Sequence, residues 1–373
     1  MPGGFILRKL SIKTVTFIVS VFICITLILS MEGCATARTK EIKDSINQLS
    51  FSHDGKKILF DRCREEVCQI QVYNLETGEL SAYQSPPNER WTMARYSYDG
   101  KNIVFSAVPM GEEYLDLSEM QIAIMYPDGK NVKKITAGPG AKIYPVFSHS
   151  GKKVLYAKAA YIRKKGGTPA AQFDAWEVDL ETGEEKRLTY FKFFTMNNLT
   201  YFPDDERFIF DGRRPEAYPD IRDNDKEAIK KMLKESSKKN MPFHGIQIMR
   251  GRKMIPNPYS IEGKLYPGHP LLSKDGTHLL FEGNGQKYYL YSPDGKHRLI
   301  GGGGSVNSAA ISPDGELLGI IYANWIITIY RIQDGSSLWI SLAEQPPTRV
   351  YGGLQNERSI TTLPGQPMYI INR

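Results

Sequence analysis

The stretch FSHDGKKILF at residues 51–60 decides the fold, because five more versions of it follow along the chain. An Asp-Gly pair between two apolar runs predicts a tight hairpin turn, since glycine accepts a positive φ and aspartate bonds to its own backbone. The other versions are YSYDGKNIVF at 96–105, FSHSGKKVLY at 147–156, YFPDDERFIF at 201–210, LSKDGTHLLF at 272–281 and ISPDGELLGI at 311–320. The repeat therefore predicts six hairpins of one kind.

The spacing of these turns is that of a propeller blade. Successive turn positions are 45, 51, 54, 71 and 39 residues apart, counted between Asp54, Asp99, Ser150, Asp204, Asp275 and Asp314. A four-stranded blade takes about 40 to 50 residues, so each interval fits one blade once insertions are allowed. A second hairpin follows every copy, as in QIQVYNLETGEL at 69–80 and ITIYRIQDGSSLWI at 327–340. Four strands in each of six repeats predict an all-β, six-bladed β-propeller.

The strand pattern F-S-x-D-G-K-x-I-x-F, followed by a Thr-Gly or Asp-Gly hairpin, resembles the TolB-like propellers. The resemblance covers about residues 46–342 and implies the same six-bladed fold. Three residues depart from the pattern: Ser150 stands in place of aspartate, Asp205 stands in place of glycine, and Gly319 lies inside the last copy. The α/β domain that precedes the propeller in TolB is not expected here, because the segment from Cys34 to Ile46 could not form it.

Residues 1–33 have the character of an export leader. Three cations and no anion precede Thr14 to Met31, which is a run of apolar and weakly polar residues. The run is longer than the apolar part of a typical signal peptide and just reaches the length that spans a bilayer. An uncleaved helix in the inner membrane is therefore an alternative to a cleaved signal.

The segment Met31-Glu32-Gly33-Cys34-Ala35 resembles a bacterial lipobox. The resemblance implies cleavage before Cys34 and lipidation of its thiol. Ala35, which follows the cysteine, implies by the same resemblance that the lipoprotein is delivered to the outer membrane and lies in the periplasm. Cleavage after Ala37 by another signal peptidase is a further alternative, and residues 34–45 are predicted to be a flexible linker.

Composition places the rest of the chain among ordinary globular proteins. Of the 373 residues, 41% are hydrophobic, 24% charged and 11% aromatic, which excludes a disordered or collagen-like chain. The net charge of +7 is spread without a long run of lysine or arginine. Nucleic acid is not expected as a partner, because the basic stripe that binds phosphates is missing.

The cysteines indicate a disulfide. Of the four, Cys24 falls in the leader and Cys34 in the lipobox, so Cys63 and Cys68 are the pair within the propeller. They bracket four residues between strand-like runs and would face each other across a hairpin in an oxidising periplasm. The alternative is a metal site, which would need two further ligands nearby, and none is evident. We expect a disulfide and no metal or cofactor.

Insertions single out one face of the predicted propeller. If the strands of each blade are called a to d, the a–b and c–d turns are tight and emerge on one face, whereas the b–c and d–a connections emerge on the other. Long connections fall on this second, loop-rich face, at 108–120, 159–173 and about 213–243, and the last includes a predicted short helix at 223–239. Loops on a rigid scaffold usually carry recognition. The candidate binding residues on the loop-rich face are Trp91, Tyr144, Phe193, Phe194, Arg213, Arg214, Tyr266 and His269.

Signals for catalysis are weak. The chain has no G-x-S-x-G nucleophile motif, and Gly301–Gly304 is interpreted as a flexible d–a loop rather than a phosphate cradle. Only His244 and His269 are expected to share the loop-rich face, fewer than the three protein ligands that a catalytic metal normally needs. We assign no catalytic residue. A metal-dependent polysaccharide lyase, or another carbohydrate-active enzyme on a propeller scaffold, is the alternative.

The sequence thus favours an extracytoplasmic binding module, held at the membrane by an N-terminal lipid or helix. Its predicted partner is an envelope protein or a cell-wall polymer, and the propeller is expected to be monomeric. Residues 343–373 lie beyond the sixth repeat and are expected to form closing strands or a partial extra blade.

Overall fold

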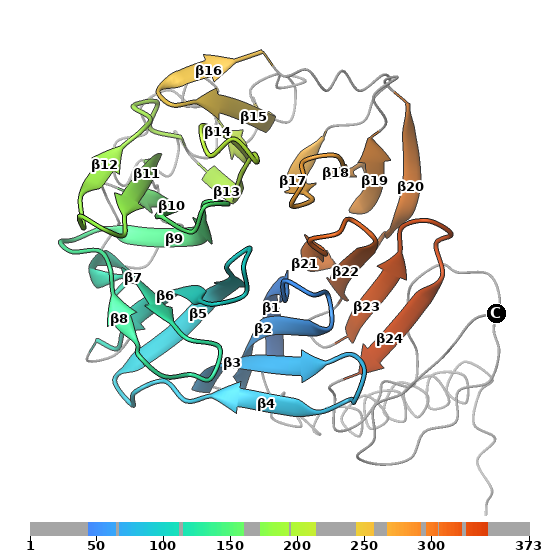
Figure 1. The fold of residues 1–373 in the computed structure, drawn as a ribbon, viewed down its shortest axis with the longest axis horizontal. Coiled ribbons are helices and arrows are strands. Elements are labelled where there is room, and N and C mark those ends of the chain that lie inside the picture. The colour runs from blue at the N-terminus through green and yellow to red at the C-terminus, as the bar shows by residue number, and fades with distance from the viewer. Residues whose placement is uncertain are drawn as a thin grey trace, which may run out of the picture. The chain divides into compact units, whose positions relative to one another are not determined.

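Six blades surround a common centre in the described part of the chain (Figure 1). The computed structural model describes residues 44–64, 67–111, 115–159, 172–193, 195–213, 244–256, 267–291, 296–304, 306–322 and 326–341. Within these residues, 24 strands form six antiparallel sheets of four, each drawn from one continuous stretch of sequence. The prediction of an all-β, six-bladed propeller is confirmed.

The strands of each blade run in chain order from the centre of the ring to its rim (Figure 1). The first three blades consist of β1 (Asp44–Phe51), β2 (Lys57–Arg64), β3 (Val67–Asn74) and β4 (Leu80–Tyr83); β5 (Glu89–Tyr96), β6 (Ile103–Pro109), β7 (Gln121–Met125) and β8 (Lys133–Lys134); and β9 (Ala141–Phe147), β10 (Lys153–Ala159), β11 (Phe173–Asp179) and β12 (Glu185–Arg187). The last three consist of β13 (Thr195–Tyr201), β14 (Arg207–Arg213), β15 (His244–Arg250) and β16 (Lys253–Ile255); β17 (Gly268–Leu272), β18 (Leu279–Gly283), β19 (Lys287–Tyr291) and β20 (His297–Gly302); and β21 (Val306–Ile311), β22 (Leu317–Tyr322), β23 (Ile326–Arg331) and β24 (Ser337–Ser341). One 3₁₀ helix, η1 (Leu117–Glu119), precedes β7.

Side chains supplied by the repeat hold the Asp-Gly turns. In the first blade, Ser52 Oγ donates to Asp54 Oδ1 at 2.5 Å, and the same carboxylate oxygen accepts from the backbone N–H of Lys56 at 3.1 Å. Gly55 takes the positive φ of 70° that the turn requires. The Ser-to-Asp hydrogen bond recurs at Ser97 and Asp99, Ser273 and Asp275, and Ser312 and Asp314. These motif residues are therefore explained by the turn itself.

Two of the three departures from the repeat pattern contact each other. Asp205, which replaces the turn glycine of blade 4, takes a φ of 55°. Its carboxylate accepts the backbone N–H groups of His149 at 2.6 Å and Ser150 at 2.9 Å, in the turn of blade 3. Blade 3 is the one whose turn lacks the usual aspartate. Ser150 makes the local turn contacts itself, with Ser148 Oγ at 3.1 Å and the Lys152 N–H at 3.4 Å, and Asp205 adds a link from the neighbouring blade.

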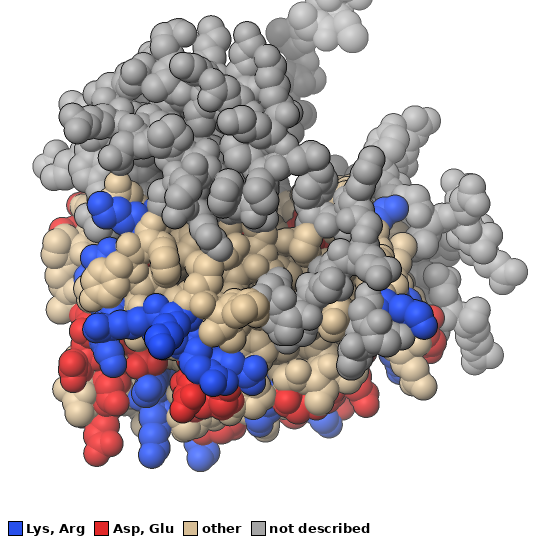
Figure 2. All heavy atoms as spheres, turned by 90° about the horizontal axis from the view of Figure 1, so that it is seen from above, with Lys and Arg blue, Asp and Glu red and all other residues tan. Residues whose placement is uncertain are grey.

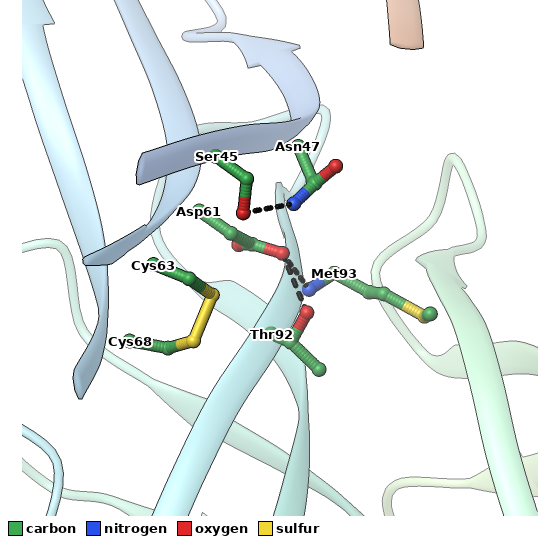
Figure 3. The surroundings of a disulfide bond; sticks show 7 residues. All are labelled: Ser45, Asn47, Asp61, Cys63, Cys68, Thr92 and Met93. Atoms are coloured by element: carbon green, nitrogen blue, oxygen red, sulfur yellow. Dashed lines mark hydrogen bonds between the residues drawn. A yellow bond between two sulfur atoms is a disulfide. The ribbon is translucent and has the colours of Figure 1, made fainter. Parts of the chain in front are cut away.

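In blades 1 and 2, the residue that follows the repeat copy reaches the next blade. In blade 1 this residue is Asp61, whose Oδ2 accepts from Thr92 Oγ1 at 2.7 Å and from the Met93 N–H at 2.5 Å (Figure 3). In blade 2 the equivalent Ser106 donates from Oγ to the carbonyl of Lys142 at 2.8 Å. Buried polar groups need such partners. These bonds fix the inner strand of one blade to the second strand of the blade before it.

Every inner strand contains a β-bulge, which the repeat pattern does not predict. The pairing of each inner strand with its neighbour shifts register, for example between Asn47 and Ser50 in β1. In five of the six described inner strands the bulge carries a residue with positive φ. These are Gln48 at 53°, Met93 at 58°, Tyr144 at 54°, Asn198 at 52° and His269 at 42°. A bulge bends a strand and increases its twist, so the inner strands bend at corresponding points around the centre.

Ring closure depends on the contact of blade 6 with blade 1. The backbone N–H of Leu49 in β1 donates to Ser308 Oγ in β21 at 3.2 Å. Leu49 and Phe51 belong to one buried cluster with residues of the sixth blade, including Ile321 and Ile327. Gly319, the third departure from the repeat, lies at this seam, where a methyl group in its place would come within 2.4 Å of Leu49 Cδ2. The glycine therefore allows the two blades to pack closely.

Cys63 and Cys68 are joined by a disulfide in the structure (Figure 3). They are direct cross-strand partners in the β2–β3 hairpin, with Cα atoms 3.9 Å apart. Cys68 is 3% exposed. The bond therefore lies where the sequence predicts it, at the mouth of the first blade's b–c connection.

Removal of this disulfide is expected to lower the free energy of unfolding by about 2 kcal/mol. The loop that it closes is short, so the cross-link restricts the unfolded chain only modestly. Chemical unfolding of wild type and the Cys63→Ser/Cys68→Ser variant should be compared with and without a thiol reductant. The reductant should shift the wild-type midpoint to that of the variant and leave the variant unchanged. A wild-type midpoint that does not respond to the reductant would contradict the pairing.

The Gly301–Gly304 run differs from the prediction of a flexible loop. Gly301 and Gly302 belong to β20 and pair with Tyr288 and Lys287 of β19. A side chain at Gly301 would meet the ring of Tyr330 in blade 6, within 2.8 Å of its nearest atoms. The physical reason for these two glycines is close packing against a strand and against the next blade, which the sequence run alone does not reveal.

Some predictions fall outside the described residues. They concern the leader at 1–33, lipidation of Cys34, the helix at 223–239 and the strands expected in 343–373. The predicted linker at 34–45 is described only at its end, where β1 already begins at Asp44. The first blade thus starts two residues before the predicted boundary at Ile46.

Candidate functional site

Two of the predicted binding residues are packing residues. Trp91 is 4% exposed and stacks at a tilt on Phe105, with ring centroids 4.7 Å apart. Phe193 is fully buried and meets Phe210 edge to face at 5.1 Å. Both belong to hydrophobic clusters at blade interfaces. Their place in the core makes them unavailable to a ligand.

Tyr144 and His269 occupy bulges of the inner strands and are partly exposed. Burial raises the pKa of Tyr144. His269 contacts Glu282 through Nδ1, and its Nε2 lies 3.7 Å from Asp211 Oδ2, so two carboxylates flank the imidazole. In the described part of the chain, no group of three or more His, Cys, Asp or Glu side chains is arranged to hold a metal ion.

The remaining predicted residues are described only in part. Arg213 ends β14 and pairs with His244 at the start of β15, so their backbones lie side by side at the mouth of the blade-4 insertion. Phe194, Arg214 and Tyr266 lie outside the described residues. Whether His244 and His269 come together therefore stays a prediction.

An aromatic loop on the loop-rich face is built around one buried carboxylate. Asp174, which is 2% exposed, accepts from Thr189 Oγ1 at 2.7 Å and from the backbone N–H groups of Phe191 at 2.9 Å and Lys192 at 3.2 Å. Arg187 adds an ion pair to the same carboxylate at 2.6 Å. These bonds shape residues 188–193, the d–a connection from blade 3 to blade 4.

This aromatic loop, residues 188–193, presents two large rings to solvent. Tyr190 is 58% exposed and Phe191 36%. The guanidinium of Arg187 lies 4.4 Å from the centre of the Tyr190 ring, and that of Arg252 in blade 4 lies 5.7 Å from it. Cation–π contacts of this kind hold an exposed ring in place. The aromatic residues that face solvent are therefore Tyr190 and Phe191, rather than Phe193 as the sequence led us to expect.

A cavity of about 100 Å³ lies in the channel between the inner strands, and all six described inner strands contribute to it. Its lining runs from bulge residues such as Asn198 to turn residues such as Tyr98 and Pro313. The cavity therefore lies toward the end of the channel where the Asp-Gly turns emerge. The sequence singled out the opposite face, so this cavity was missed.

Two cations line this channel cavity. Arg95 in β5 donates from Nη1 to the carbonyl of Leu199 in β13 at 2.9 Å, and so spans from blade 2 to blade 4. Lys274, in the turn after β17, donates from Nζ to the carbonyl of Tyr98 at 2.9 Å. Burial lowers the pKa of Arg95. In the sequence both cations look like ordinary surface residues, because the repeat places them beside the turn and not in a recognisable motif.

Mixed charge surrounds the turn end of the propeller. The turns carry ion pairs between neighbouring side chains, such as Lys56 with Glu76 at 2.8 Å and Arg207 with Asp204 at 2.5 Å. Figure 2 shows Lys, Arg, Asp and Glu side chains gathered along one side of the described surface. Because these pairs are solvent-exposed, they contribute little stability.

The chain resembles known proteins in its fold, and the comparisons show nothing beyond that. Neither a protein-family model nor a curated protein sequence matches the chain. Among solved structures, TolB from Acinetobacter baumannii is similar, with 21% identity and a TM-score of 0.46 over 69% of this chain and 54% of that one. The chain thus spans about half the length of that protein. A TolB structure from Agrobacterium tumefaciens has 18% identity and a TM-score of 0.49 over 73% of this chain and 87% of that one.

An enzyme is also among the similar structures. Oligogalacturonate lyase from Vibrio parahaemolyticus has 14% identity and a TM-score of 0.49, over 80% of this chain and 79% of that one. The similar structures thus include TolB proteins and a lyase, and at these identities no activity follows for this chain. In the described residues no helix is long and apolar enough to cross a membrane.

Proposed function

We propose that the protein is an extracytoplasmic binding module, tethered to the membrane by its N-terminal segment, which recognises an envelope protein or a cell-wall polymer without chemical turnover. The lipobox-like segment at Cys34 supports anchoring to the outer membrane from the periplasmic side. The rigid ring would then display its connections to partners in the envelope.

The observation that carries the proposal is the aromatic loop 188–193, the d–a connection from blade 3 to blade 4. Two adjacent exposed rings form a small apolar patch, and tryptophan, tyrosine and arginine are the residues enriched at the energetic centres of interfaces. Here a buried carboxylate, Asp174, fixes the backbone that carries Tyr190 and Phe191. Because the loop is already ordered, binding would cost little conformational entropy.

Truncation of these rings should weaken partner binding at least tenfold, since aromatic contacts at the centre of an interface dominate its energy. The full-length protein, its Tyr190→Ala/Phe191→Ser variant and a Tyr126→Ala control should be used to capture material from an envelope extract. Tyr126 is 50% exposed and lies in the c–d turn of blade 2, in a different blade from the loop. Wild type and control should retain the same protein or polymer, and the double variant should lose it.

Circular dichroism must show that all three proteins are folded. Equal retention by all three, or loss confined to Tyr126→Ala, would overturn the assignment of the face. Retention of oligosaccharide that is cleaved with time would favour the carbohydrate-active alternative and would overturn the proposal of binding without turnover.

A further inference from the structure

The channel cavity contains a cation without an anion. Arg95 is partly buried, and its one hydrogen bond to protein in the described part of the chain goes to the neutral carbonyl of Leu199. The charged or polar groups close enough to influence it are the hydroxyls of Tyr98 and Tyr144. A guanidinium has five N–H donors. Most of the hydrogen-bonding capacity of Arg95 is therefore left for a ligand or for water.

A second cation approaches the same cavity from across the ring. Lys274 belongs to blade 5 and Arg95 to blade 2, and the inner strands β17 and β5 lie on opposite sides of the centre (Figure 1). The Lys274 ammonium also bonds to a neutral carbonyl, that of Tyr98. No Asp or Glu occurs among the described residues that line the cavity. The cavity thus has two positive charges in its wall and no negative charge to balance them.

Burial of the Arg95 guanidinium is costly, whereas Lys274 stays exposed to solvent at the edge of the cavity. A charge that leaves water without a partner loses far more solvation than one neutral hydrogen bond restores. The lowered pKa of Arg95 has the same cause, which is burial. The buried Lys142 likewise donates to neutral carbonyls, those of Met120 at 2.8 Å and Gly138 at 2.7 Å. Arg95 differs in that it lines a cavity, where its remaining N–H donors can reach a ligand.

We propose that the channel cavity is a binding site for a small carboxylate, held by Arg95 and Lys274. A guanidinium matches a planar carboxylate through two parallel hydrogen bonds. Much of the remaining wall is apolar, including Phe51, Val146 and Leu271, and suits a hydrocarbon body better than a fully hydrated phosphate. A volume of about 100 Å³ has room for a few heavy atoms. The site goes beyond the proposed recognition by the loop-rich face and does not depend on it.

The test uses sodium propionate and sodium butyrate as probes of the full-length protein, with sodium chloride at equal ionic strength as the reference. A ligand that binds the folded state raises the unfolding midpoint with its concentration. We expect both carboxylates to raise the midpoint of wild type, and saturation-transfer NMR to show contact with the propyl chain of butyrate. Arg95→Met and Lys274→Gln should weaken the apparent affinity at least tenfold. Lys101→Gln, which removes an exposed cation paired with Asp99 in the same blade, should leave it unchanged.

A purely structural role for Arg95 gives a different result. It would make Arg95→Met less stable at every carboxylate concentration, with the same response to butyrate as wild type, and that outcome would overturn the site. If Arg95→Met fails to fold, Arg95→Lys serves instead: it keeps the charge but not the planar fork, and should bind butyrate several-fold more weakly. Tighter binding of inorganic phosphate than of butyrate, or no response beyond that to chloride, would overturn the proposed ligand class.

Discussion

Replacing Gly302 with alanine is expected to destabilise the protein by about 4 kcal/mol or more, which is among the largest effects that a single methyl group can have. Gly302 takes a φ of 102°, where L side chains are strained. A methyl group there would lie 2.5 Å from the carbonyl oxygen of Gln286 and 2.9 Å from Lys287 Cα. Both are backbone atoms, one just before β19 and one at its first residue, and backbone there cannot move aside as a side chain can. The midpoint and slope of chemical unfolding measure the loss.

Gly303→Ala is the matched control for this effect. Gly303 has nearly the same φ, 98°, but the nearest atoms to an added methyl would be those of the Lys287 side chain at 3.9 Å. This variant therefore bears the backbone strain without the clash, and should lose about 1 to 3 kcal/mol. Equal losses in the two variants would show that the β19–β20 pairing at Gly302 is not as close as described.

The stability of the propeller is expected to fall as the pH rises from about 4 to about 7, with Asp61 as a main cause. Burial raises the pKa of this carboxyl to about 7 from its ordinary 3.8, against the lowering effect of hydrogen bonds from Thr92 and Met93. In this window the folded protein keeps a proton that the unfolded chain has released, so the free energy of unfolding decreases with rising pH. At roughly 1.4 kcal/mol for each unit of pKa, the contribution is at most about 4 kcal/mol. Above pH 7 it is lost and the curve flattens.

Unfolding in urea at a series of pH values checks this expectation. Asp61→Asn cannot ionise, so the fall between pH 4 and 7 should become shallower in that variant. Asp54→Asn in the same blade is the control, because the hydrogen bond from Ser52 lowers the pKa of Asp54 and its contribution changes below that window. A pH profile that is the same in Asp61→Asn and wild type would show that Asp61 does not titrate there.

The repeat allowed the blades to be predicted, because each copy contains a complete local signal for a turn. Asp54 and Gly55 need only their own neighbours to form that turn. The inner-strand bulges could not be predicted, since Met93 takes its left-handed conformation in contact with Asp61 of another blade. For the same reason the sequence predicted a loop at Gly301 and Gly302, which the structure places in β20. Their partners are distant in sequence, so the sequence alone does not show them.

The candidate site was predicted less well than the fold. Choosing aromatic residues in the d–a connections drew attention to loop 188–193, but pattern alone could not tell Phe193, which the core buries, from Tyr190, which solvent reaches. Arg95 and Lys274 were missed because they come together only when the ring closes. A lone arginine in a strand is usually a surface residue, and only its place in the wall of the channel cavity distinguishes it.

Each described sheet is drawn from one unbroken stretch of the chain, and the seam between the first and last blades is made by contacts of β1 with β21. A gene that gained or lost one repeat would therefore leave every other sheet whole. The new protein would need to form only the one or two interfaces at the point of the change, and Gly319 shows at the present seam how closely two blades fit. The number of blades in such a ring is thus open to change in one genetic event, whereas the turn and bulge within each repeat are inherited as a unit.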